Sequence, residues 1–179
     1  MIYTTHYASP MGDIMLAARE NALIGLWIDG QKYFLGSIKE DIACGDDVEV
    51  LIQANDWLDR YFGGSNPSIS ELPLAPEGSD FAKSVWDILR KIPYGETTTY
   101  GAIASRITKD KGLSRMSAQA VGGAVGHNPI SIIIPCHRVV GSSGSLTGYA
   151  GGIGKKIWLL THEGLDMARF TVPTKGTAI

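Results

Sequence analysis

A cysteine, a histidine and an arginine follow one another at Cys136, His137 and Arg138, directly after an apolar run with three isoleucines. A thiol is a useful nucleophile only as the thiolate, and a nearby imidazole can take its proton. The alternative is that the cysteine is a core residue, because free cysteines are among the most buried residues. That alternative suits Cys44 well and Cys136 less well. The residue types therefore indicate Cys136 as a nucleophile and His137 as its base.

A nucleophile and its base need a third group that orients the base. The segment 158–164 reads Trp-Leu-Leu-Thr-His-Glu-Gly, which is typical of a helix that ends at its final glycine. Glu163 in this segment is the candidate for holding His137, and an exposed residue at a helix end is the alternative. The run 131–140 predicts a buried strand. Neighbours on an extended chain point opposite ways, so Cys136 and His137 would need a turn or a bridging water to communicate.

The sequence argues against a structural zinc site and against a Walker-type phosphate loop. Cys44 and Cys136 are far apart, and the four histidines form no close ligand pair. Lys155 follows a glycine-rich segment, 141–154, but not in a Gly-Lys-Ser/Thr context. This segment is either a flexible loop or a loop whose backbone approaches a ligand closely. It carries Tyr149, a potential hydrogen-bond donor.

The first half of the chain opens with strand signals. Two apolar runs at 12–19 and 22–29 are separated by Glu20-Asn21 and predict a hairpin. Apolar residues at mixed spacing of three and four predict a helix near 47–62, which Gly63-Gly64 ends. The segment 65–79 contains three prolines and is predicted to be the linker between the halves.

The second half reads mainly as helices. Ser79 or Asp80 can cap a helix that Pro93 stops, and the threonines 97–99 can cap a second helix. Ser117 can cap a third, from 118 to about 126. The last two helices, joined by a polar link, fit a helix-turn-helix, although such pairs are also common packing units.

Composition excludes several classes of protein. Hydrophobic residues make up 44% of the 179 residues and charged residues 19%, which is too apolar for intrinsic disorder. No stretch approaches the roughly 18 apolar residues that a membrane span needs. The first ten residues do not resemble a secretory signal. Two cysteines cannot cross-link a secreted scaffold, so we expect a reduced, cytoplasmic protein.

The net charge of −2 hides an asymmetry along the chain. Residues 1–80 contain four Lys or Arg and thirteen Asp or Glu, whereas residues 81–179 contain twelve and five. Such a division suggests a polyanion as partner of the second half. The alternative is that the acidic half is simply a solvated surface, and charge alone slightly favours it.

Over residues 80–165 the chain resembles the O6-alkylguanine-DNA alkyltransferases, also called methylated-DNA–protein-cysteine methyltransferases. The motifs that carry this resemblance, in chain order, are Tyr94-Gly95-Glu96, Thr99-Tyr100, Ala120-Val121-Gly122-Gly123, Asn128-Pro129, Pro135-Cys136-His137-Arg138-Val139, Gly148-Tyr149-Ala150-Gly151-Gly152, Lys156 and His162-Glu163-Gly164. The first half resembles the family's ribonuclease-H-like domain loosely.

The resemblance implies an α+β fold with two domains. Residues 1–78 would form a small ribonuclease-H-like α/β domain with the linker. Residues 79–170 would form a mainly helical winged-helix domain that binds DNA and carries the alkyltransferase site, and residues 171–179 a tail.

The resemblance also implies the chemistry at the cysteine. Cys136 would take the alkyl group from O6 of guanine, and His137, through a water, would act as base with Glu163 orienting it. Tyr100 would press on the phosphate and assist protonation of the departing guanine. Asn128 would brace the turn beneath the cysteine strand.

By the same resemblance, a pocket would hold the base after it has left the duplex. The backbone of Tyr149 and Ala150 and the carbonyls of Cys136 and Val139 would contact the base, with Lys156 behind Tyr149. A methyl group on O6 is inaccessible inside a duplex, so the base must leave the stack.

DNA contacts are expected from one helix and from the residue after the catalytic pair. They are Gln119, Ala120, Gly122, Gly123 and Arg138. Glycines let the backbone approach DNA closely, and the basic half attracts phosphate. The family usually has an arginine where Gln119 stands; a glutamine can fill the gap and hydrogen-bond the orphan base, but it brings no charge.

The implied function is DNA repair by irreversible transfer to Cys136, once per molecule. O4-alkylthymine is a second candidate substrate. The expected partner is double-stranded DNA with alkylated bases, bound by a monomer without cofactor, metal or membrane. A non-catalytic winged-helix damage sensor is the first alternative, and Cys136 stands against it. A Cys-His hydrolase is the second, and it would not explain the basic half.

Overall fold

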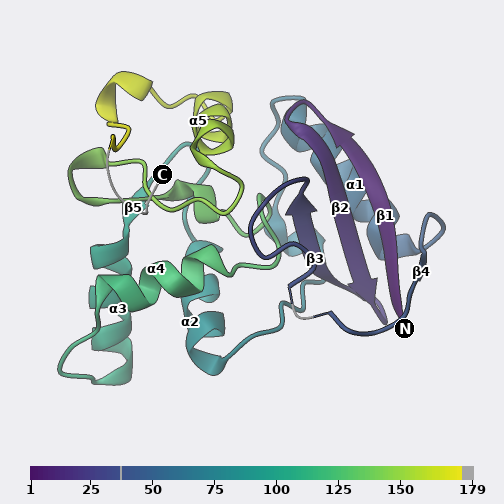
Figure 1. The fold of residues 1–179 in the computed structure, drawn as a ribbon, viewed down its shortest axis with the longest axis horizontal. Coiled ribbons are helices and arrows are strands. Elements are labelled where there is room, and N and C mark those ends of the chain that lie inside the picture. Colours follow the sequence, from purple (N-terminus) through teal and green to yellow (C-terminus); the bar gives the residue numbers. More distant parts are fainter. Residues whose placement is uncertain (37, 175–179) are drawn as a thin grey trace. The chain divides into compact units, whose positions relative to one another are not determined.

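The computed structural model describes residues 1–36 and 38–174 and divides into two compact units (Figure 1). Unit 1 consists of Met1–Glu77 and Pro129–Ile133, and unit 2 of Gly78–Asn128 and the chain from Ile134 onward. The first unit contains a sheet and the second is mainly helical, so the expected α+β fold class is confirmed. The domain limits 1–78, 79–170 and 171–179 stay predictions, and residues 175–179 of the expected tail lie outside the described residues.

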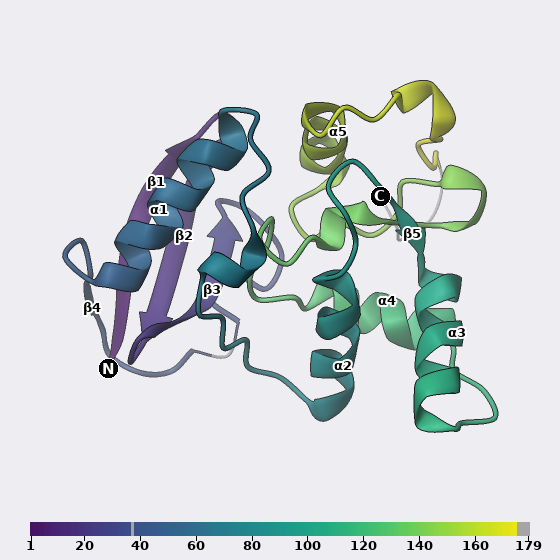
Figure 2. The ribbon, with the colours of Figure 1, turned by 180° about the vertical axis from the view of Figure 1, so that it is seen from behind.

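Over its described residues, unit 1 is a four-stranded sheet with one long helix on it. Its elements are β1 (Ile2–Ser9), β2 (Gly12–Arg19), β3 (Ala22–Ile28), β4 (Ile42–Cys44), α1 (Glu49–Phe62) and the 3₁₀ turn η1 (Ile69–Glu71). The strand order is β3-β2-β1-β4, with β4 parallel to β1 and the other pairs antiparallel. Figure 2 shows α1 lying across the face of β1 and β2. The hairpin and the helix are the ones expected from the sequence.

The proline-rich segment after α1 is more than a linker. The backbone N–H of Leu23 in β3 donates to Pro73 at 2.8 Å, and Ala75 N–H donates back to Leu23 at 2.9 Å. Further along β3, Leu26 N–H donates to Pro129, also at 2.8 Å. These two segments cover the outer edge of β3, which protects an otherwise unpaired strand edge. The segment 65–79, predicted to be the linker between the halves, therefore also pairs with β3 within unit 1.

Up to residue 174, unit 2 contains four helices and a short parallel strand pair. Its elements are α2 (Asp80–Leu89), β5 (Thr98–Thr99), α3 (Tyr100–Lys111), α4 (Ala118–Gly126), β6 (Val139–Val140), α5 (Ile153–His162) and the 3₁₀ turns η2 (Cys136–Arg138), η3 (Ser142–Gly144) and η4 (Met167–Arg169). Hydroxyls cap three helices as expected: Ser79 accepts from Ala82 N–H, Thr99 from Ala102 N–H and Ser117 from Ala120 N–H.

The core of unit 2 lies in two places. Helices α2, α3 and α4 bury apolar side chains against one another, and the indole N–H of Trp86 donates to the carbonyl of Ala124 at 2.9 Å. The second cluster joins α5 to the glycine-rich loop and to the segment after α5. Its buried members are Val140, Leu146, Leu160 and Leu165. No helix within residues 1–36 and 38–174 is long and apolar enough to cross a membrane.

Candidate active site

The cysteine lies on a tight turn rather than on a strand. Cys136 is the first residue of η2, and its N–H donates to the carbonyl of Ile134 at 2.8 Å. Ile132 has a φ of +69°, which breaks any extended run over the isoleucines. The strand predicted over 131–140 is therefore wrong before Val139. The burial that the isoleucines indicated is real, because every residue from 131 to 140 is buried, but a buried turn gives the same apolar signal as a buried strand.

The turn changes how neighbouring side chains point. A 3₁₀ turn has three residues per turn, so successive side chains differ by roughly 120° rather than 180°. The side-chain amide of Asn128 donates to the Ile134 carbonyl at 2.8 Å and braces this turn from beneath. Asn128 is 3% exposed and also hydrogen-bonds the thiol of Cys136. These hydrogen bonds fit the bracing role that the resemblance implies for Asn128, and that role stays a prediction.

Burial keeps Cys136 in its thiol form. The side chain is 4% exposed, and this desolvation raises the pKa of the thiol above its ordinary value. The Asn128 amide, the Lys156 ammonium and the backbone N–H groups of Cys136 and His137 oppose the rise without cancelling it. Because the thiolate is the nucleophile, this site needs a base.

One ring nitrogen of His137 is hydrogen-bonded, and the other has no partner among the described residues. The imidazole is fully buried, and its Nε2 lies 2.7 Å from Oε1 of Glu163. A carboxylate can only accept, so the shared proton resides on Nε2 and Nδ1 keeps its lone pair. Nδ1 is buried and has no hydrogen-bond partner among the described residues. Desolvation lowers the pKa of His137 and outweighs the opposing pull of Glu163, so the ring is neutral near pH 7.

Arg138 points into the protein. Its side chain is 6% exposed, with Nε and Nη2 on the two oxygens of Glu163 at 2.9 and 3.0 Å. Nη1 donates to the carbonyl of Ile92 at 2.7 Å. The expected DNA contact of Arg138 is therefore contradicted, because all three guanidinium nitrogens bind inside unit 2.

Tyr100 and Lys156 meet at one backbone carbonyl. The Thr147 carbonyl accepts from the Tyr100 hydroxyl and from Lys156 Nζ, both at 2.9 Å. Lys156 is fully buried and also donates to the carbonyl of Val139. Burial lowers the pKa of Lys156 to about 8, and burial raises the pKa of Tyr100 to about 12. Tyr100 therefore keeps its proton at neutral pH.

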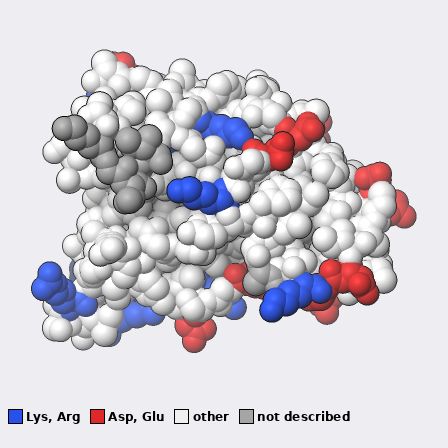
Figure 3. Space-filling view, viewed as in Figure 1, with Lys and Arg blue, Asp and Glu red and all other residues white. Residues whose placement is uncertain are grey.

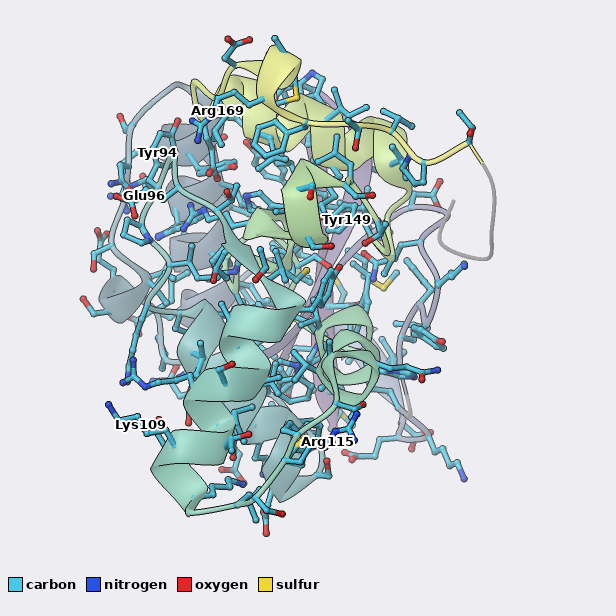
Figure 4. The ribbon with its side chains drawn as sticks, turned by 90° about the vertical axis from the view of Figure 1, so that its left-hand side faces the viewer. Tyr94, Glu96, Lys109, Arg115, Tyr149 and Arg169 are labelled. Carbon is cyan, nitrogen blue, oxygen red and sulfur yellow. The ribbon has the colours of Figure 1, made fainter. Side chains whose placement is uncertain are left out.

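The glycine-rich loop supplies a second phenol to the site, and this one is buried. Tyr149 is 7% exposed, and its hydroxyl has no hydrogen-bond partner within residues 1–36 and 38–174. Burial raises its pKa, with Cys136 adding to the rise. Ala150 follows at a half-buried position. Figure 4 shows Tyr149 above α3 and α4 in that view.

Helix α4 presents small residues and one glutamine on its exposed side. Gln119, Ala120 and Gly123 are exposed, whereas Val121 is fully buried. A Cβ at Gly123 would meet no protein atom within 4 Å, so packing does not require this glycine. A Cβ at Gly122 would come no closer than 3.8 Å to the ring of Tyr100.

Basic side chains surround the turn between α3 and α4. Figure 3 shows Lys and Arg gathered at the lower left, where Figure 1 places α3. The exposed basic residues of this part are Arg106, Lys109, Lys111 and Arg115. Figure 4 shows Lys109 and Arg115 at the same end of these helices.

Some groups of the site had no signal in the sequence. The carbonyls of Thr147 and Ile92 accept hydrogen bonds, and the N–H of Gly95 donates to Oε2 of Glu163 at 3.3 Å. These are backbone groups, about which residue type says nothing. Arg138 was visible beside His137, but its pairing with Glu163 depends on the turn. Within the described part of the chain, no group of three or more His, Cys, Asp or Glu is placed to hold a metal ion.

Both halves of the chain match known protein families. Residues 80–165 match the family described as "6-O-methylguanine DNA methyltransferase, DNA binding domain". Residues 2–76 match "6-O-methylguanine DNA methyltransferase, ribonuclease-like domain". The chain belongs to the 6-O-methylguanine DNA methyltransferase family. The resemblance seen in the cysteine motif and the glycine-rich loop is thereby confirmed.

Relatives of this methyltransferase family match nearly end to end. "Methylated-DNA--protein-cysteine methyltransferase" of Methanosarcina acetivorans is 43% identical over 91% of this chain and 99% of its own length. The protein of the same name from Haemophilus influenzae is 38% identical, over 90% of this chain and 86% of its own.

Solved methyltransferase structures show the same fold. Mycobacterium tuberculosis O6-methylguanine methyltransferase superposes with a TM-score of 0.75 at 38% identity, covering 98% of this chain and 97% of that one. Mycobacterium tuberculosis OGT in complex with DNA gives a TM-score of 0.74 at 38% identity and covers 94% of each chain.

Proposed function

We propose that this protein repairs DNA by transferring the alkyl group of O6-alkylguanine to the sulfur of its own Cys136, once per molecule. The observation that carries the proposal is the unengaged Nδ1 of His137, buried in the same turn as the thiol, in a chain of the methyltransferase family. A neutral imidazole with a lone pair is the acceptor that a buried thiol requires.

The proton and electron pair can be followed through the transfer. The thiol proton passes to Nδ1 of His137 through a water, and Glu163 holds Nε2–H while the ring becomes positive. The sulfur electron pair then attacks the alkyl carbon on O6. A sulfur–carbon bond forms, the carbon–oxygen bond breaks, and its electrons leave with guanine. No co-reactant is required, which supports action without a cofactor.

The departing guanine needs a proton, and Tyr100 is the proposed donor. Its raised pKa means that the phenol is protonated at neutral pH. In the structure its hydroxyl donates to the Thr147 carbonyl, so donation to the base requires that this bond be exchanged. Arrival of the flipped base next to Gly148, where a Cβ would lie 3.3 Å from the hydroxyl, fits such an exchange.

The proposed base pocket is formed by backbone groups around the cysteine. The carbonyls of Cys136 and Val139 and the backbone of Tyr149 and Ala150 contact the base. Lys156 fixes two walls of this pocket, because it donates to both the Val139 and the Thr147 carbonyls. A buried ammonium without hydrogen-bond acceptors would destabilise the folded protein. Lys156 therefore keeps both hydrogen bonds, which hold the two carbonyls in place.

DNA is the proposed partner, bound through α4. Its exposed Gln119, Ala120 and Gly123 allow close approach, and the basic residues around the α3–α4 turn supply attraction for phosphate. Gln119 fills the gap that the flipped base leaves. We also propose that the protein acts as a cytoplasmic monomer and that O4-alkylthymine is a second substrate.

Serine variants of the two cysteines test this proposal. Both cysteines are free thiols, but Cys44 is exposed and Cys136 is buried, so the expectation that Cys44 is a core residue is wrong. Cys44→Ser is the control, because it removes the other thiol of the chain. Repair of a duplex that contains one O6-methylguanine is measured by digestion and base analysis. Cys136→Ser should abolish repair and Cys44→Ser should leave it unchanged. Repair by Cys136→Ser would refute the proposal, and DNA binding without repair by the unaltered chain would support a non-catalytic sensor.

A further inference from the structure

The carboxylate of Glu163 is surrounded by donors on every side. Oε1 accepts from His137 Nε2 at 2.7 Å and from Arg138 Nη2 at 3.0 Å. Oε2 accepts from Arg138 Nε at 2.9 Å and from the backbone N–H of Gly95 at 3.3 Å. Glu163 is 5% exposed, so these donors replace water as its solvation. They hold the pKa of this carboxyl far below its ordinary range against the opposing effect of burial.

Arg138 is fixed in this position by two more contacts. Its Nη1 donates to the Ile92 carbonyl, and its guanidinium carbon lies 5.7 Å from the centre of the Tyr94 ring. The fork of an arginine matches a carboxylate with two parallel hydrogen bonds, and a lysine would make one contact. The cation is therefore placed directly against the anion that holds the base.

The charge of this cation decides what Glu163 does to His137. A lone buried carboxylate beside an imidazole favours the imidazolium, because the opposite charges attract strongly away from water. An imidazolium carries a proton on Nδ1 and cannot accept another. With Arg138 in place, the Glu163–Arg138 pair next to His137 has no net charge. The free-energy cost of burying an imidazolium then exceeds the remaining attraction, and the ring stays neutral.

We propose that Arg138 is the counter-ion that keeps His137 neutral, so that Nδ1 can accept the proton of Cys136. Glu163 then orients the ring without charging it, because the Arg138 cation beside it offsets the carboxylate charge that His137 experiences. The role of the neutral ring rests on the proposed alkyl transfer, but the pKa of His137 can be measured without it.

Other ionisable groups also face His137, and they are the same in every variant compared below. Lys156 adds positive charge that favours the neutral ring, and Cys136 lies on the same turn. The charge of Glu163 helps to raise the pKa values of Tyr94 and Tyr149, so both phenols keep their protons.

The test is the titration of His137 in the full chain without DNA. The protein has four histidines, and the NMR signal of labelled His137 is assigned by its loss in His137→Gln. Arg138→Met leaves a charge of −1 next to the ring, Glu163→Gln leaves +1, and the double variant leaves none. The pKa of His137 should therefore rise by about one unit or more in Arg138→Met and fall in Glu163→Gln. The double variant should return it to near the unaltered value.

Two further variants make the result decisive. Arg138→Lys keeps the charge and should restore the ordinary titration, whereas Arg169→Met removes an exposed arginine of the same unit and should change nothing. If Arg138→Met does not fold, Glu163→Gln is compared with the double variant. These two proteins differ only in the Arg138 charge, so the pKa of His137 must be higher in the double variant. An unchanged His137 pKa in that comparison, or in Arg138→Met, would overturn the proposal.

A kinetic readout separates positioning from mere stability. Transfer to Cys136 by Arg138→Met should be slow at pH 7 and recover as the pH rises through the new His137 pKa. A structural defect would instead lower the rate equally at every pH, and that outcome would overturn the proposal. Failure of the proposed function would look different, because no variant would transfer an alkyl group while the titrations still followed the charge.

Discussion

At the scale of single residues, the site combines a buried thiol with a buried neutral imidazole. Burial raises the pKa of Cys136 and lowers that of His137, so both hold their uncharged forms in the resting protein. Charge therefore develops only when the proton moves, at the moment of transfer. Lys156 lies close enough to lower the thiol pKa in part, which favours the thiolate once it forms.

The first prediction concerns the base. His137→Ala should slow alkyl transfer about 10²–10⁴-fold at neutral pH, because general-base catalysis contributes on that order. Without the base, the thiolate must form by loss of the proton to solvent. Since the thiol pKa is raised, the rate should climb with pH through a range above that of an ordinary cysteine. Rates measured from pH 6 to 10 check this, and an unchanged profile would remove His137 from the mechanism.

Gln119 carries the second prediction, because it is exposed near the start of α4, where the family usually has an arginine. Gln119→Arg should speed repair of duplex DNA, since a guanidinium can stack in the gap and attract phosphate. Gln119→Ala should slow duplex repair. Neither should alter reaction with free O6-alkylguanine, which needs no flipping.

The matched control for Gln119 is Gln53→Arg, which adds the same charge at an exposed position of α1. It should not change the ratio of duplex to free-base rates. Equal effects of the Gln119 variants on both substrates would mean that this residue has no part in base extrusion.

At the scale of elements, the loop before α5 is fastened by the segment that follows α5. Leu146 N–H donates to Thr171 at 2.8 Å, and Thr171 N–H donates to Gly144 at 3.0 Å. Phe170 packs against the cluster of Val140 and Leu146. This fastening keeps the part of the loop that carries the Thr147 carbonyl in register with Tyr100 and Lys156.

The third prediction tests that fastening at Gly144. Its φ is +77°, and a Cβ would lie 2.6 Å from the carbonyl of Arg169. Gly144→Ala should therefore lower the free energy of unfolding by at least about 1 kcal/mol and slow transfer. Gly154→Ala is the control, because its Cβ in α5 would meet nothing within 4 Å; it should leave stability equal or higher. Denaturant unfolding measures both, and equal losses would contradict the prediction.

The sequence was informative about elements where local chemistry decides them. Hydroxyl caps at Ser79, Thr99 and Ser117 predicted the starts of α2, α3 and α4. Strands β1 and β4 were missed. The partner of β4 is β1, about forty residues away along the chain, whereas β1 pairs with its immediate neighbour β2 and was missed as the first strand of a tight hairpin. The turn at Cys136 was mistaken for a strand, since a run of isoleucines signals burial and not conformation. Tertiary structure holds Ile132 at a positive φ that no local rule favours.

The sequence indicated which residue types form the candidate site, but not which of them hydrogen-bond to one another. Cys136, His137 and Glu163 are recognisable because few residues can act as nucleophile, base and orienting group. The reversal of Arg138, from expected DNA contact to buried partner of Glu163, follows from the turn, which directs three consecutive side chains differently. Charge in the second half suggested DNA but did not say which arginine reaches it.

At the scale of the whole molecule, charge is divided between an acidic first half and a basic second half. The fourth prediction is that DNA affinity depends on the basic residues near the α3–α4 turn. Lys109→Glu with Arg115→Glu should weaken duplex binding and reduce the dependence of log Kd on log salt by about 0.9 for each phosphate that the variant no longer neutralises. Lys32→Glu makes the same kind of change at an exposed site in unit 1 and should have little effect. Binding that does not vary with salt would refute the assignment.

The mass of the intact protein after reaction is the most direct test of transfer to Cys136. The full chain is incubated with an excess of duplex that contains O6-methylguanine, and the modified residue is then located by peptide mapping. We expect one added methyl group per chain, on Cys136, with the amount of repaired DNA equal to the amount of protein. A methyl group on Cys44, or many repaired sites per unmodified chain, would contradict transfer to Cys136.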